Sequence, residues 1–273
     1  MPPLTVVHVT DNHLYADAER VNDGLVPAET CRAVLAAAAA AAPSADALVL
    51  TGDFTNDDSE ASYTLMKALV RGAFPQTPVF FVPGNHEELV RLERVFVPEF
   101  VGPAASSRLV DVPLAGEGSR WRLLLLNTFL GGGAVHGGVD APTAAALEEA
   151  LASADARGEF VLLALHHPPV PPAGELPPWS GNCLREPEAL LRSLQAHPCC
   201  RVGLHGHLHA DTCTRLGHAS VYCTPSTCTQ TVVQSDSWQI DVDAKPGFRL
   251  VTLHEDGSHE TAVHRVNVRQ VLQ

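Results

Sequence analysis

The sequence predicts an α/β fold with a binding site at one edge of a sheet. Short β-rich runs alternate with helical patterns, polar residues follow where apolar strands end, and 273 residues suffice for one domain with a substantial core. Ligands of open α/β sheets bind outside the carboxyl ends of the strands. We therefore expect a single domain over residues 1–273, with a site that collects residues from five strand ends.

Strands are predicted where β-branched and other apolar residues cluster, at residues 5–9, 47–50, 79–82, 121–126, 160–165 and 202–204. Helices are predicted between them, at residues 28–42, 59–70, 88–96, 142–156 and 187–196. Pro43 ends the first helix, and Asp140 or Thr143 begins the fourth. The pattern then changes to strands separated by turns, at residues 220–223, 239–242, 247–253 and 260–266.

The chain is acidic, with a formal net charge of -13 from 31 acidic and 18 basic residues. A surface of this charge repels the phosphate backbone, so we expect no nucleic-acid partner. Bound cations would offset part of the charge. The expected partner is a small molecule.

Seven cysteines are present, an odd number without the spacing of a disulfide framework or a CxxC zinc pair. This composition favours reduced thiols and a cytoplasmic protein. Residues 1–8 lack the features of a signal peptide, and the Ala-rich run at residues 34–42 is too short to span a bilayer. We therefore expect neither export nor insertion in a membrane.

Candidate metal ligands follow the first two predicted strands. Asp11 and His13 can converge on one cation, although most such triplets occur by chance on a polar surface. Asp53 follows Gly52, which permits a tight turn, and the two oxygens of its carboxylate could bridge two metals. The alternative for Asp53 is a helix cap or a turn residue.

The third motif, Gly84-Asn85-His86-Glu87, again follows a predicted strand. The side-chain oxygen of Asn85 is a neutral metal ligand, and His86 beside it is placed to act without coordinating a metal. Asn and His have few structural reasons to occur together beside a strand-ending glycine. This motif is therefore more specific than the first two.

Histidines form the last two motifs. Adjacent imidazoles point in different directions, so at most one of His166 and His167 is a ligand; the alternative is a partly buried pair in a loop. His207 and His209 project from a short turn, and neutral imidazole suits Zn, Fe and Mn. The alternative for this pair is a solvated, histidine-rich loop.

In this order, the five motifs resemble those of the calcineurin-like metallophosphoesterase superfamily, from Val6 to His209. The resemblance implies a four-layer α/β/β/α sandwich of two mixed β-sheets flanked by helices. Residues from about 220 to 273 would complete the second sheet or form a small cap. The resemblance also suggests a homodimer.

Carried over residue by residue, the resemblance implies two metal sites that share one carboxylate. The implied ligands are Asp11, His13, Asp53 and His209 for one cation and Asp53, Asn85, His166 and His207 for the other. His166 rather than His167 matches, because the family's ligand lies two residues before the proline. Asn85 and His86 would bind the substrate, with His86 as the catalytic group. Two divalent or mixed-valence ions are implied, with Fe and Mn favoured and Zn or Co as alternatives.

Residues 183–191, 224–230, 246–257 and 263–266 are similar to segments of bacterial class III 3',5'-cyclic nucleotide phosphodiesterases. The resemblance implies hydrolysis of 3',5'-cyclic AMP, or a related cyclic nucleotide, to the 5'-nucleotide by a hydroxide that the two cations activate. Asn127 departs from a frequent Asp, and the segment at residues 131–138 is unusually rich in glycine. Both departures concern the substrate and leave the metal ligands intact.

Other functions stay open. A glycerophosphodiesterase or a broad-specificity phosphodiesterase would use the same ligands. A catalytically silent metal-binding module would have lost a ligand or His86, and none is lost. The GDxxDRG signature of protein Ser/Thr phosphatases does not follow Gly52, where the chain reads GDFTNDD.

Overall fold

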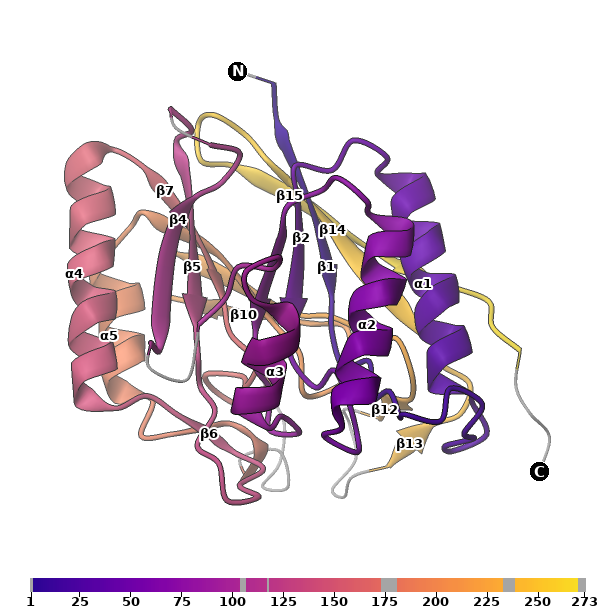
Figure 1. Ribbon diagram of the computed structural model, residues 1–273. Helices are drawn as coiled ribbons and strands as arrows, with labels where there is room; N and C mark the ends of the chain where they lie inside the picture. The colour runs from indigo at the N-terminus through magenta and orange to yellow at the C-terminus, as the bar shows by residue number, and fades with distance from the viewer. Residues whose placement is uncertain (1, 104–106, 117, 173–180, 233–238, 270–273) are drawn as a thin grey trace.

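Two large mixed β-sheets face each other in the computed structural model, which describes residues 2–103, 107–116, 118–172, 181–232 and 239–269. Helices cover the outer face of each sheet (Figure 1). This arrangement confirms the predicted α/β class with two mixed sheets flanked by helices. It also determines which strand ends meet.

The first sheet has the strand order β15-β14-β1-β2-β3. Its strands are β1 (Leu4–Val9), β2 (Ala47–Thr51), β3 (Val79–Val82), β14 (Gly247–Leu253) and β15 (His259–Arg265). Strands β1, β2 and β3 run parallel, whereas β14 is antiparallel to β1 and to β15. Its outer face carries the helices α1 (Pro27–Ala41), α2 (Glu60–Ala73) and α3 (Leu89–Phe96).

The second sheet has the strand order β10-β11-β9-β7-β5-β4. Its strands are β4 (Leu109–Pro113), β5 (Trp121–Leu126), β7 (Phe160–Ala164), β9 (Cys200–His205), β10 (Thr212–Leu216) and β11 (Ala219–Cys223). Its outer face carries α4 (Ala141–Arg157) and α5 (Glu188–Ala196). Two small sheets pair β6 (Gly137–Gly138) with β8 (Leu184–Arg185) and β12 (Gln230–Thr231) with β13 (Ile240–Asp241).

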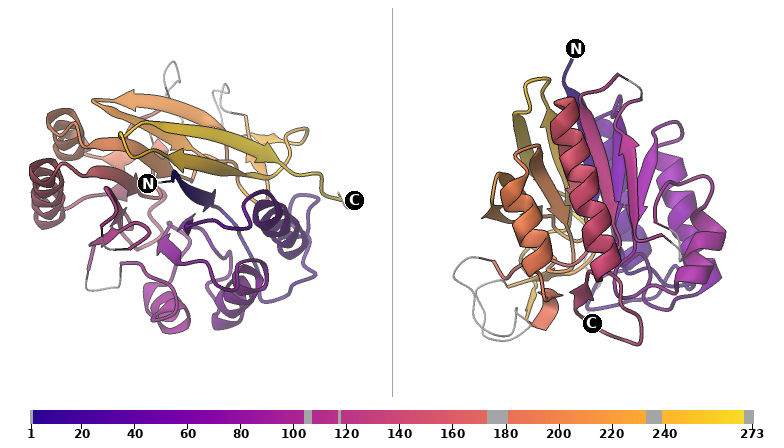
Figure 2. Two further views of the ribbon diagram at one scale, coloured as in Figure 1. Left: turned by 90° about the horizontal axis from the view of Figure 1, so that it is seen from above. Right: turned by 90° about the vertical axis from the view of Figure 1, so that its left-hand side faces the viewer.

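Successive side chains of each strand point to opposite faces of its sheet, so each strand contributes to two layers of the core. In β1, Val6 packs between the sheets, whereas its neighbour Val7 packs under the helices of the first sheet. In β5, Leu125 and Leu124 divide in the same way between the two faces. Complete burial of such a side chain stabilises the fold by about 1.5–3 kcal/mol. Figure 2 shows the resulting sandwich, with the helices confined to the outer faces of the sheets.

The placement of the C-terminal strands differs from our expectation. We expected residues from about 220 onward to complete the second sheet or form a small cap, but β14 and β15 extend the first sheet beside β1. Only β11 of this segment lies in the second sheet, while β12 and β13 form a separate small pair. The alternation of apolar residues along a strand indicates which of its faces is buried, but it does not indicate which strand lies beside it, so the pairing of β14 with β1 could not be predicted.

Several local expectations can be refined. Asp140, and not Thr143, is the N-cap of α4, because its Oδ1 accepts a hydrogen bond from the Thr143 amide at 2.9 Å. The edge strands β4 and β10 were not predicted, since each is only partly buried and has no continuous apolar run. No helix among the described residues is long and apolar enough to cross a membrane.

Candidate metal centre

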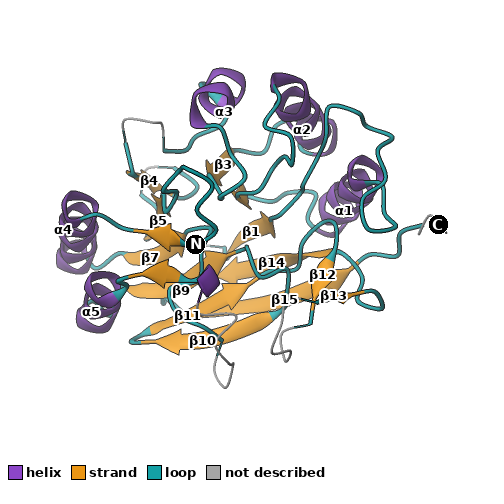
Figure 3. Cartoon of the chain, turned by 90° about the horizontal axis from the view of Figure 1, so that it is seen from below, coloured by secondary structure: helices purple, strands orange, loops and turns teal. Residues whose placement is uncertain are grey.

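The carboxyl ends of five parallel strands deliver all eight predicted site residues to one end of the sandwich, viewed in Figure 3. The loops after β1, β2, β3, β7 and β9 carry, in that order, Asp11 and His13, Asp53, Asn85 and His86, His166, and His207 and His209. A cleft of about 350 Å³ opens there. Its lining includes His13, Asp53, Asn85, His86, His207 and His209.

Five of these residues adopt left-handed backbone conformations. The φ angles are 53° at Asp11, 50° at His13, 52° at Asp53, 70° at His207 and 48° at His209. Such angles are uncommon for residues with a Cβ and cost about 1–3 kcal/mol each, so surrounding contacts must impose them. Backbone bonds between the loops do so, from Asp11 N to Gly52 O at 3.0 Å and from His13 N to Asp53 O at 2.9 Å.

The first cluster joins Asp11, His13 and His209, whose ligand atoms lie close enough to hold one cation. His209 Nε2 lies 3.0 Å from His13 Nε2 and 3.4 Å from Asp11 Oδ1. The opposite nitrogens are held from outside, His13 Nδ1 by Asn56 Oδ1 at 2.8 Å and His209 Nδ1 by the Thr229 carbonyl at 2.9 Å. Both Nε2 atoms are therefore directed at the same point.

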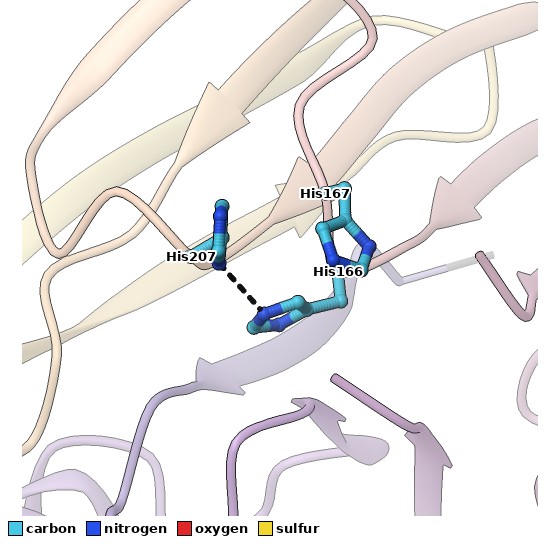
Figure 4. Close-up of side chains that lie close together, drawn as sticks. All are labelled: His166, His167 and His207. Carbon is cyan, nitrogen blue, oxygen red and sulfur yellow. Dashed lines mark hydrogen bonds between the residues drawn. The ribbon is translucent and has the colours of Figure 1, made fainter. Parts of the chain in front are cut away.

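The second cluster surrounds the Nε2 atom of His166. Asn85 Oδ1 and His207 Nδ1 each lie 3.2 Å from it, and Asp53 Oδ1 lies at 3.4 Å. His166 Nδ1 donates to the Thr51 carbonyl at 2.6 Å, which orients the ring so that Nε2 faces the other three groups. Figure 4 shows the hydrogen bond between the rings of His166 and His207.

Asp53 connects the two clusters. Its Oδ1 faces His166, and its Oδ2 lies 3.8 Å from His13 Nε2. The Asp53 carboxylate also occupies the position that a Cβ on Gly84 would take, so only glycine fits at that turn. The two oxygens of Asp53 therefore face different clusters.

His167 lies beside the second cluster, although the sequence left it outside the ligand set. Its ring centroid is 4.8 Å from that of His166 and 4.9 Å from that of His207 (Figure 4). Its Nδ1 lies 2.8 Å from Thr128 Oγ1, whereas its Nε2 has no hydrogen-bond partner in the described part of the chain. The His167 ring therefore packs against the second cluster, and a hydrogen bond to Thr128, just after β5, holds it there.

The protonation states of three predicted ligands suit metal binding directly. Burial, followed by the charge of His209, lowers the pKa of His13 to about 4, and burial with His166 lowers that of His207 to about 3. Burial opposes ionisation of Asp53, but the neighbouring His166 holds the Asp53 pKa well below its ordinary value. At neutral pH His13 and His207 are therefore neutral imidazoles and Asp53 is a carboxylate, which are the forms that bind metal ions. Burial opposes a charge on His166 and His209, but Asp53 raises the pKa of His166 to about 9 and Asp11 raises the pKa of His209, so a metal bound by His166 displaces a proton from its ring.

Glu87 is a structural residue of the site that we did not predict. Its buried carboxylate accepts hydrogen bonds from the amides of Phe54 at 2.7 Å, Asp53 at 3.2 Å and Gly84. Burial and the nearby Asp53 raise its pKa to about 8, while the amide donors favour the ionised form. Glu87 joins the loops after β2 and β3. In the sequence, only the position of Glu87 at the end of the Gly84–Glu87 motif indicated a role in the site.

Comparisons with known proteins agree with this geometry. The family model of calcineurin-like phosphoesterases matches residues 4–211. The chain is 32% identical to the 3',5'-cyclic adenosine monophosphate phosphodiesterase CpdA of Pseudomonas aeruginosa, covering 97% of this chain and 90% of that one. It is 27% identical to a 3',5'-cyclic-nucleotide phosphodiesterase of Nostoc, covering 97% and 93%.

Among solved structures, a dimetal phosphatase from Danio rerio shares the fold, with a TM-score of 0.66 and 16% identity, covering 98% of this chain and all of that one. The fold and the paired clusters define a hydrolytic metallophosphoesterase. The chain belongs to the calcineurin-like phosphoesterase family.

Proposed function

We propose that this enzyme is a binuclear-metal phosphodiesterase that hydrolyses 3',5'-cyclic AMP to the 5'-nucleotide. The observation that carries the proposal is the pair of ligand clusters sharing Asp53 beside an open cleft that contains His86. Support for the substrate comes from relatives of nearly full length that are named cyclic nucleotide phosphodiesterases.

The proposed ligands divide into two sets around Asp53. Asp11, His13 and His209 would hold one cation with Asp53, and Asn85, His166 and His207 would hold the other. This mixed set of oxygen and nitrogen donors fits Fe or Mn, and also Zn or Co. When bound, two such cations acidify a coordinated water and neutralise charge on the phosphoryl oxygens.

His86 is proposed as the catalytic residue. Its side chain is exposed and lines the cleft, and its amide donates to Asp53 Oδ1 at 3.0 Å, which ties its backbone to the shared carboxylate. The ring centroid of His86 is 5.1 Å from that of His13. From this position the imidazole would hydrogen-bond the phosphate with Asn85 and donate a proton to the leaving oxygen. In a cyclic diester that oxygen becomes the 3'-hydroxyl of the product.

We further propose that the protein works in the cytoplasm, as a homodimer, on a small-molecule diester. None of the seven cysteines forms a disulfide, which fits a reducing compartment. The charge of -13 disfavours nucleic acid as substrate. Light scattering of the purified protein tests the dimer.

The test of function is turnover of a substrate panel by protein reconstituted with Mn²⁺. The panel contains cyclic AMP, cyclic GMP, a glycerophosphodiester, a bis-aryl phosphate and an aryl monoester. The proposal expects the highest kcat/KM for cyclic AMP, with 5'-AMP as product. A preference for the glycerophosphodiester or comparable rates on all diesters would favour the alternative functions, and a 3'-AMP product would contradict the proposed leaving group.

A further inference from the structure

A chain of buried polar side chains runs between the two sheets and ends on Asp11. Thr10 Oγ1 lies 2.8 Å from Asp11 Oδ2, and Thr51 Oγ1 lies 2.8 Å from Thr10 Oγ1. His8 Nε2 lies 2.8 Å from Thr51 Oγ1, and His8 Nδ1 lies 2.6 Å from Thr224 Oγ1. Arg249 Nε completes the chain, 3.1 Å from Thr224 Oγ1. The strands β1, β2, β11 and β14, or the residues that follow them, supply its members.

The two ends of the chain determine the direction of every bond. The Thr10 hydroxyl has two acceptors within reach, Asp11 Oδ2 at 2.8 Å and the Thr51 carbonyl at 3.1 Å, and the shorter contact is to the ionised carboxylate. Because both groups only accept, Thr10 accepts from the Thr51 hydroxyl, which accepts in turn from His8 Nε2. Burial, with the charge of Arg249, holds the pKa of His8 well below its ordinary value, so the ring is neutral and its Nδ1 accepts from Thr224. Arg249 can only donate, so its Nε–H donates to Thr224 Oγ1, which thereby both donates and accepts a hydrogen bond.

The cation at the far end is itself held firmly. Arg249 is 3% exposed, and its remaining nitrogens donate to the Cys223 carbonyl at 2.8 Å, Thr261 Oγ1 at 3.1 Å and Asp211 Oδ1 at 2.6 Å. Burying an arginine between sheets costs free energy that apolar packing would not. A fold that needed only packing at this position would be served by an aliphatic residue. The arrangement therefore calls for a role beyond packing.

We propose that Arg249, Thr224 and His8 are positioning residues that fix the Asp11 carboxylate for metal binding. Their chain engages Asp11 Oδ2, the His207 amide donates to both carboxylate oxygens at 3.0 and 3.1 Å, and Oδ1 faces His209 Nε2, 3.4 Å away. Gly206 makes room for the contact, since a Cβ there would collide with Thr10 Oγ1 and Asp11 Oδ2. Hydrogen bonds in such a chain strengthen one another in a low-dielectric interior. The inference rests on the proposed role of Asp11 as a ligand.

Thr224 offers the sharpest test, because it is buried and touches no proposed ligand side chain. Thr224→Val should weaken Mn²⁺ binding by about 10-fold, the lower end of the effect of losing a direct partner of a metal ligand, because three side chains separate Thr224 from Asp11. Thr224→Ser should restore the affinity. Thr261→Val is the matched control, because it removes another partner of Arg249 and leaves the chain intact. It should bind Mn²⁺ like the wild type.

Binding is measured by titration with Mn²⁺ followed by electron paramagnetic resonance, alongside the unfolding free energy of the metal-free proteins. Wild-type affinity in Thr224→Val, or an equal loss in Thr261→Val, would overturn the proposal. If Thr224→Val does not fold, Thr51→Val interrupts the same chain, and Thr51→Ser keeps the hydroxyl as its control. A loss of Mn²⁺ affinity in Thr51→Val alone would support the proposal, and equal affinity in both would overturn it. A wild-type protein that binds no metal would instead refute the proposed function.

Discussion

The Nε2 atoms of His13 and His209 lie 3.0 Å apart, although 196 residues separate them in the chain. A hydrogen bond between two such nitrogens needs one ring to carry its proton on Nε2. The Thr229 carbonyl can only accept, which places the proton of a neutral His209 on Nδ1. The pair is therefore suited to a shared cation, and the residues behind the rings should control metal affinity.

Asn56 should be required for tight binding of the metal that His13 holds. Its Oδ1 orients His13 through Nδ1, so Asn56→Ala should weaken Mn²⁺ binding by about 10–100-fold. Isothermal titration calorimetry measures the change. Asn56→Asp keeps the acceptor and should lose less affinity than Asn56→Ala. The reverse order would show that Asn56 does not act by orienting the ring.

Replacement of Asp53 should remove metal and not only activity. The carboxylate faces both clusters, so Asp53→Ala should empty at least one metal site, as measured by elemental analysis after gel filtration. Asp17→Ala changes an exposed carboxylate and serves as the control for lost negative charge. Full occupancy by two ions in Asp53→Ala would contradict the shared ligand.

His86 should separate catalysis from metal binding. His86→Ala should keep both ions and lower kcat by about 10²–10⁴-fold, the usual contribution of general acid–base catalysis. Discontinuous activity assays give kcat, and elemental analysis of the same sample gives the metal content. The exposed His218→Ala is the control and should retain full activity. Unchanged turnover in His86→Ala would remove His86 from the mechanism.

His197 should make the fold more stable at acidic than at alkaline pH. Its Nδ1 lies 2.7 Å from Asp155 Oδ2 and its Nε2 lies 2.9 Å from Glu148 Oε1, which ties the end of α5 to α4. Burial lowers the pKa of His197, but the hydrogen bonds and charges of Glu148 and Asp155 outweigh burial and raise it. The stabilisation is then fully present below about pH 6.5 and is lost as the pH rises through the folded-state pKa.

The difference in unfolding free energy between wild type and His197→Gln should therefore be larger at pH 6 than at pH 9. Urea denaturation at both pH values measures it, and comparison with the variant cancels the titration of the metal ligands. His218→Gln replaces an exposed histidine and serves as the surface control. A difference that is constant from pH 6 to 9 would show that His197 is not stabilised as a cation.

Much of the site could be predicted because its residues follow strand ends in short motifs. Asp53 lies two residues after the end of β2 and Asn85 three residues after the end of β3, and parallel strands end on the same edge. The groups that orient the ligands could not be predicted. The Thr51 and Thr229 carbonyls hold His166 and His209, but every residue carries a carbonyl, so these contacts leave no mark in the sequence.

The alternation of strands and helices and the order of the five motifs could be predicted without the structure, because local periodicity and turn chemistry act over a few residues. The tertiary structure decided that β14 lies beside β1, and so brought Arg249 within reach of His8 through Thr224. It also decided that Asp53 faces both clusters. The contacts of Thr224 with Arg249 and His8 join residues 25 and 216 positions apart, and only packing of the two sheets brings them together.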